Sequence, residues 1–120
     1  GGENAASQRA RDAEFDVATA LYRQAVLQGV AEAQSALVQL DHERQRVAAA
    51  VAVEEAVRMR SKATEAQVRL GLADGFQQAD ARGAALQASR DTLRAGLAEQ
   101  VAYIALFTSF GGAVLPPASP

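Results

Sequence analysis

The chain contains no proline before Pro116. Proline removes a backbone donor and clashes with the preceding turn of a helix, so its absence permits helix over almost all of the 120 residues. Alanine, the best helix former, is the commonest residue, at 29 positions. With abundant Glu, Gln, Arg and Leu, this composition predicts long helices or a coiled coil rather than a globule with a thick core.

An apolar stripe runs along the first part of the chain. Its members recur three or four residues apart, as one face of a helix requires. They are Phe15, Ala18, Tyr22, Val26, Gly29, Ala33, Leu37 and Leu40. Further along, Glu54 precedes Arg58 by four residues, a spacing that supports a solvated helix face. The pattern predicts a helix over residues 4–70.

A turn is predicted at residues 71–74. Gly71 can adopt the left-handed conformation that ends a helix, with Leu72 folding back on the last turn. Asp74 is the expected N-cap of a second helix, and Gln77 completes a capping box three residues later. A connection this short joins antiparallel neighbours, so the first helix is expected to be followed directly by its partner.

The second helix, predicted over residues 75–110, carries a similar stripe, interrupted only by Arg90. The stripe consists of Phe76, Ala79, Gly83, Leu86, Arg90, Leu93, Leu97, Val101, Ile104 and Phe107. Small residues at Ala79 and Gly83 suggest a close approach of the helices near the turn. The predicted fold is therefore all-α: a long antiparallel hairpin over residues 1–112, with one helix about twice the length of the other and a disordered tail over 113–120.

The unequal helix lengths imply a partner. At 1.5 Å per residue the first helix would be roughly 100 Å long and the second roughly 54 Å. The second helix then covers the first only from about Gln34 onward, and the stripe from Phe15 to Val30 is left uncovered. Because a contiguous apolar surface is normally buried, we expect an oligomer or a larger helical assembly.

The sequence argues against several functions. A net charge of −2 with no basic stripe gives no support for nucleic-acid binding. The start of the chain lacks the features of a signal peptide, and no apolar run reaches the ~18–20 residues that cross a bilayer. His42, the only histidine, and acidic pairs such as Glu54 and Glu55 are expected to be solvated helix surface. We therefore expect no enzyme, no catalytic or metal-binding residues and no cofactor.

Three segments, in order, resemble the TolC-like outer-membrane factor family, the channels of tripartite efflux and secretion systems. The first is Leu21-Tyr22-Arg23-Gln24-Ala25-Val26-Leu27-Gln28, followed by Glu32 and Ala36-Leu37. The second is Gly71-Leu72-Ala73-Asp74-Gly75-Phe76, followed by Asp80-Ala81-Arg82 and Leu86. The third is Ala102-Tyr103-Ile104-Ala105-Leu106-Phe107, closed by Gly111-Gly112. The likeness covers about residues 15–112.

The chain departs from the family pattern at three places. The family usually has an aromatic residue three positions before the turn glycine, where this chain has Val68. The usual Asp-Val-Leu-Asp run of the returning helix is Gln77-Gln78-Ala79-Asp80 here, and the usual Gly-Gly-Gly-Trp ending is Gly111-Gly112-Ala113-Val114. These changes affect residue-level expectations at the turn but not the hairpin itself.

The resemblance implies a homotrimeric channel in the cell outer membrane. The hairpin would form part of its periplasmic α-barrel, would meet the membrane only through parts absent from this chain, and would conduct substrates passively. A periplasmic adaptor and an inner-membrane pump would be its partners. The turn would contact the adaptor through Arg69, Gly71, Leu72, Ala73, Asp74 and Phe76.

Two other functions fit the composition. One is a stand-alone coiled coil that acts as an oligomerising scaffold, which would bury the uncovered stripe by self-association. The other is an amphipathic protein of lipid surfaces, which fits less well because the apolar faces are narrow and rich in alanine and the polar faces are not rich in lysine.

Overall fold

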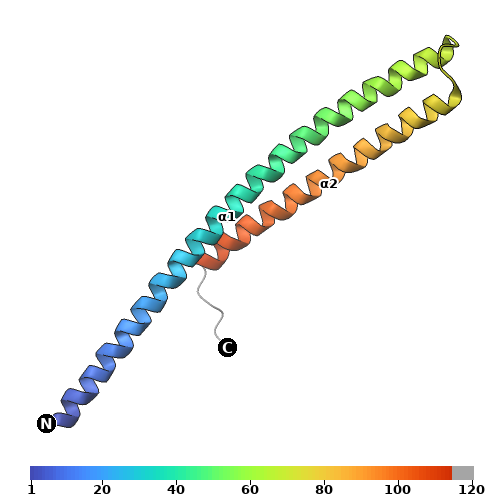
Figure 1. The fold of residues 1–120 in the computed structure, drawn as a ribbon. Helices are drawn as coiled ribbons and strands as arrows, with labels where there is room; N and C mark the ends of the chain where they lie inside the picture. Colours follow the sequence, from blue (N-terminus) through green and yellow to red (C-terminus); the bar gives the residue numbers. More distant parts are fainter. Residues whose placement is uncertain (115–120) are drawn as a thin grey trace.

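The computed structural model describes residues 1–114, and these form a helical hairpin (Figure 1). Helix α1 (Gly2–Arg69) has 68 residues and α2 (Gly75–Val114) has 40, and the molecule is 104 Å along its longest axis. The predicted fold class, an all-α hairpin with unequal helices, is confirmed. Of the predicted tail at 113–120, Ala113 and Val114 belong to α2, and residues 115–120 lie outside the described part.

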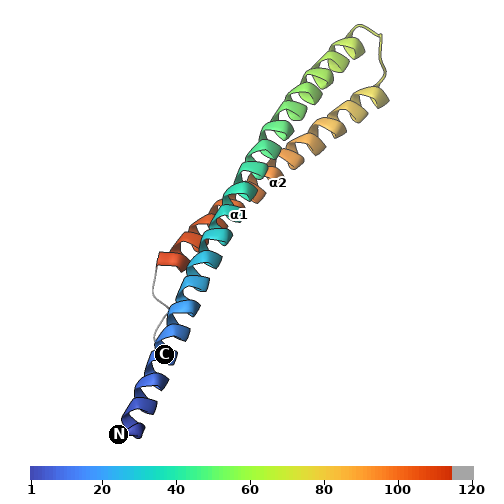
Figure 2. The same ribbon diagram turned by 60° about the vertical axis from the view of Figure 1, so that its left-hand side comes forward.

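The face of α2 that packs against α1 consists of small residues. Ala81, Ala88, Ala95 and Ala102 recur at every seventh position and are buried. Half-buried residues lie four positions after each alanine: Ala85, Thr92, Glu99 and Leu106. This heptad spacing gives a left-handed supercoil, and α2 accordingly passes across α1 along the hairpin (Figure 2). We call this face the inner seam of α2.

The matching inner seam of α1 is also spaced by three and four residues, and it is buried or half-buried throughout. Its members are Ala36, Leu40, Glu43, Val47, Ala50, Glu54, Val57, Ser61, Thr64 and Val68. The alanines of α2 leave room for the larger side chains of this seam, so the two helices can pack closely. Each buried methyl group contributes on the order of 0.8 kcal/mol, so the hairpin depends on many small contributions.

The apolar stripe predicted on α2 lies on the other side of the helix. Leu93 is 68% exposed whereas Ala95, two residues away, is 6% exposed, because two residues correspond to about 200° of helical rotation. The large residues Phe76, Leu86, Leu97, Ile104 and Phe107 are exposed on the same side, which we call the outer face of α2. The predicted close approach at Ala79 and Gly83 is wrong within this chain: both are exposed, and a Cβ at Gly83 would meet no atom within 4 Å.

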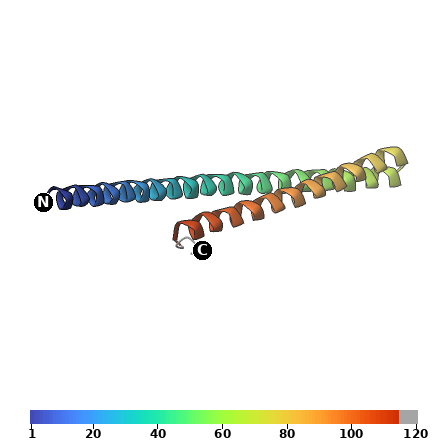
Figure 3. The same cartoon turned by 90° about the horizontal axis from the view of Figure 1, so that it is seen from below.

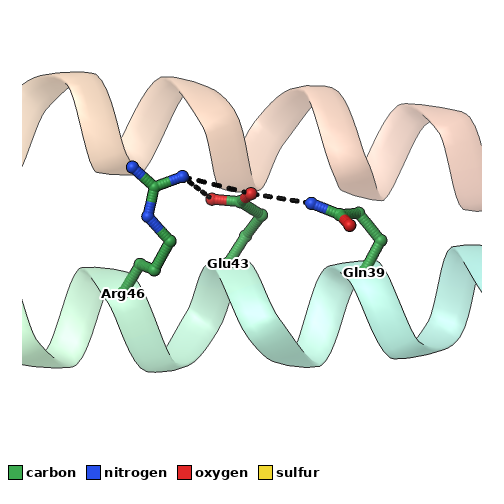
Figure 4. A network of polar contacts seen from close by, with 3 residues as sticks. All are labelled: Gln39, Glu43 and Arg46. Carbon is green, nitrogen blue, oxygen red and sulfur yellow. Dashed lines mark hydrogen bonds and ion pairs between the residues drawn. The ribbon is translucent and has the colours of Figure 1, made fainter.

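One acidic residue is buried in the inner seam. Glu43 is 5% exposed, and its carboxylate accepts hydrogen bonds from Gln39 Nε2 at 2.8 Å and from an Arg46 guanidinium nitrogen at 3.2 Å (Figure 4). One residue along, Arg44 Nε lies 3.8 Å from Glu99 Oε1 on α2. Both partners of Glu43 lie on α1, so its buried carboxylate is satisfied within its own helix, whereas the Arg44–Glu99 pair joins the two helices.

The first part of α1 has no partner among the described residues. It extends alone beyond the end of α2 (Figure 3), and the apolar residues Phe15, Tyr22, Val26 and Val30 along it are exposed. The predicted uncovered stripe is therefore confirmed. Neither described helix contains a segment long and apolar enough to cross a membrane.

Candidate functional site: the hairpin tip

The tip begins where α1 ends at a Schellman motif. Gly71 has φ of 74°, the left-handed conformation, and its N–H donates to the carbonyl oxygen of Val68 at 3.1 Å. The N–H of Leu72 donates to the carbonyl oxygen of Gln67 at 2.8 Å. These two bonds satisfy carbonyl groups that a helix end leaves free. The predicted left-handed glycine is confirmed.

The start of α2 is fixed by a reciprocal pair of hydrogen bonds. The N–H of Gln77 donates to Asp74 Oδ1 at 2.8 Å, and the N–H of Asp74 donates to Gln77 Oε1 at 3.0 Å. This is the predicted capping box. Both helix ends at the tip are therefore closed by specific bonds, so the tip is a defined structure and not a loose loop.

Apolar side chains project from this defined turn into solvent. Leu70 and Leu72 are each 75% exposed, and Phe76 is 82% exposed. Leu72 returns to α1 only through its backbone hydrogen bond. A turn that is rigid in its backbone yet presents a leucine pair and a phenylalanine has the features of a contact surface, because exposed apolar clusters commonly mark interaction sites.

The other residues predicted at the tip have different surroundings. Arg69 is the last residue of α1 and is exposed, Ala73 is half-buried, and Asp74 is exposed while serving as the cap. The structure therefore places all six predicted contact residues at one end of the hairpin. Gly71 and Asp74 form the turn and the helix cap. The side chains of Leu72 and Phe76 are the most exposed of the six and therefore the most accessible to a partner.

A polar groove of about 390 Å³ lies on one flank just below the tip. Arg60, Thr64 and Gln67 of α1 line one side, and Gln77 and Asp80 of α2 line the other. The groove was not predictable from the sequence, because it depends on which flanks of the two helices lie side by side. It offers polar groups of both helices beside the apolar tip.

Among the remaining chemistry-bearing residues, Glu55 is exposed as predicted, whereas Glu43 is buried and Glu54, predicted to be solvated surface, is half-buried. His42 is exposed as predicted, and no group of acidic residues or histidine among the described residues is arranged to hold a metal ion. Arg58 pairs with Glu55 three residues earlier rather than with Glu54, because Glu54 belongs to the inner seam. The burial of Glu43 was not predicted, because acidic residues of a helix are expected at its surface.

Comparison of the chain with protein-family models, with curated proteins and with solved structures gives no match.

Proposed function

We propose that this chain forms part of the periplasmic α-barrel of an outer-membrane channel subunit, in a tripartite system that exports substrates. In this proposal the long hairpin is a segment of the tube wall. Transport is passive: the wall encloses a path for the substrate, and a pump elsewhere drives it. No catalytic residue or cofactor is required.

The observation that carries the proposal is that α2 has two packing faces on nearly opposite sides. The alanines of the inner seam pack against α1, while Leu93, Leu97 and Ile104 of the outer face are exposed and have no partner among residues 1–114. A helix in a two-helix coiled coil needs one seam. A helix in the wall of a tube has a neighbour on each side and needs two, and α2 has that pattern.

The tip supports the second part of the proposal, contact with a periplasmic adaptor. It combines a rigid backbone with exposed Leu72 and Phe76, and the polar groove at Arg60 and Asp80 lies beside it. A helical hairpin of a partner could approach closely here, because Gly71, Ala73 and Gly75 have little or no side chain.

A chimera tests this function. Residues 15–112 replace the second helical hairpin of a TolC-like channel subunit, aligned on the turn glycine, in cells that lack the channel. We expect the chimera to restore growth in the presence of a toxic pump substrate. A matched chimera with Leu72→Asp should assemble equally well but restore less growth, because Leu72 lies in the turn, outside both helices, and its side chain is 75% exposed.

The contrary result is a chimera that reaches the membrane as a trimer and exports nothing with either residue at position 72. The alternative, an oligomerising scaffold, would then be favoured, because the exposed outer face could join copies of the hairpin without enclosing a path.

A further inference from the structure

The outer face of α2 is a regular apolar surface that no described residue covers. Leu86, Leu93, Leu97, Ile104 and Phe107 are each more than 60% exposed and fall at heptad spacing. Heptad spacing of large residues is the signature of a surface that packs along another helix. The partner must therefore present a helix of similar length with complementary side chains.

The outer face of α1 has the complementary sizes. Opposite its inner seam, α1 exposes Val38, Gln45, Ala48, Ala52 and Met59, of which the central members are small. Large side chains of α2 could insert between these alanines as knobs into holes. The two faces point away from each other within one hairpin, so they can meet only between two copies.

The ion pair between the helices shows which residues would be level in such a contact. Arg44 and Glu99 lie side by side. Counting nine residues toward the tip from each gives Val53 on α1 and Arg90 on α2. If a second hairpin stands beside the first with its tip at the same end, Arg90 is level with Val53 of the neighbour.

Side chains of opposite charge lie on the two outer faces at this level. Arg90 is the only charged residue within the outer stripe of α2, and it is exposed. Glu55 lies on the outer face of α1 two residues from Val53, roughly 3 Å along the axis at 1.5 Å per residue. Both side chains are long enough to bridge that offset, and Glu55 now pairs only with Arg58 on its own helix.

The same arginine disfavours the symmetric alternative. If the outer faces of two α2 helices packed together about a two-fold axis, the stripe from Phe76 to Phe107 would be centred near Arg90 and Leu93. The two Arg90 side chains would then lie close together, and like charges at such a contact are unfavourable. Glu55 would have no role in that arrangement.

We propose that the outer face of α2 binds the outer face of α1 of a second copy of this chain, with the hairpins side by side, their tips at the same end, and Arg90 paired with Glu55. Such a contact is head-to-tail, so it adds copies in one direction and closes into a ring or continues as an open array. The inference holds whether or not the assembly conducts a substrate.

Cross-linking tests the arrangement directly, because the chain has no cysteine. One preparation carries Ala52→Cys and another, isotope-labelled, carries Leu93→Cys; the two are mixed and treated with a short thiol-reactive cross-linker. Mass spectrometry should find mainly the 52–93 product. Dominant 93–93 product would establish the symmetric pairing and overturn the proposal, as would a chain that sediments as a monomer at every concentration.

Charge reversal tests the pairing. Arg90→Glu and Glu55→Arg should each weaken self-association by about tenfold, since each replaces an attraction by a repulsion. An equal mixture of the two variants should regain it, because every contact between unlike chains again joins Glu to Arg. Arg94→Glu, on a flank of α2, is the control and should have little effect. A mixture that associates no better than either variant would contradict the pairing, provided that circular dichroism shows both variants to be helical.

Discussion

Arg44 and Glu99 form the one ion pair that joins α1 to α2 among the described residues, with Arg44 Nε 3.8 Å from Glu99 Oε1. Both side chains retain contact with water, at 59% and 31% exposure. We expect a double-mutant cycle with Arg44→Ala and Glu99→Ala to give a coupling of less than about 1 kcal/mol, decreasing with added salt. A larger, salt-independent coupling would mean that the pair holds the helices together rather than marking their alignment.

Gly71 should be the glycine that the fold least tolerates replacing. Its φ of 74° is unfavourable for any residue with a Cβ, although the space around it is open. Gly71→Ala should lower the free energy of unfolding by about 1 to 2 kcal/mol, measured by urea denaturation of the monomer. Gly96→Ala, also in open space but with helical φ, is the control and should raise it by about 0.5 to 1 kcal/mol. Equal effects would show that the turn tolerates another conformation.

The capping box makes Asp74 a second sensitive position at the tip. Asp74→Ala removes the acceptor for the N–H of Gln77 and should cost about 1 kcal/mol of stability. Asp74→Ser keeps an acceptor oxygen at the same place and should lower the stability by only about 0.3 kcal/mol. The comparison uses thermal unfolding followed by circular dichroism, and identical losses for the two variants would show that the cap contributes little.

The inner seam should reject large side chains although it is apolar. Ala95 is 6% exposed against α1, so Ala95→Leu forces the helices apart and should cost about 1 to 3 kcal/mol. Ala84→Leu, at an exposed position of the same helix, is the control and should change stability by less than about 0.5 kcal/mol. Stabilisation by Ala95→Leu would mean that the inner seam lies elsewhere on α2.

The sequence allowed the hairpin, its turn and both caps to be predicted, because these depend on local signals: the absence of proline, a glycine at the helix end, and an Asp with a Gln three residues later. The uncovered start of α1 followed from the unequal helix lengths. The position of the tip residues was therefore predictable, whereas the groove beside them depends on how the helices are rotated.

That rotation could not be read correctly from apolar periodicity. Helix α2 carries two stripes of the same period, one of large residues through Leu93 and one of alanines through Ala95. A search for apolar periodicity selects the stripe of large residues, because these are the more hydrophobic. Close packing of two backbones favours the small ones instead. The burial of Glu43 was not predictable for a related reason. It depends on the rotation of α1, which places Glu43 in the inner seam, and on the hydrogen bonds from Gln39 and Arg46, which satisfy its carboxylate there.

The central claim is that the two faces of α2 have different tasks: the alanines fold the hairpin, and the large residues bind a neighbour. Sedimentation and circular dichroism of the double variant Leu93→Ala/Leu97→Ala test it most directly. We predict a chain that remains helical, with the unfolding free energy of the monomer nearly unchanged, and that no longer self-associates. The contradicting result is a variant that self-associates as strongly as the original chain but has a much lower free energy of unfolding as a monomer. It would place Leu93 and Leu97 in the core of the hairpin.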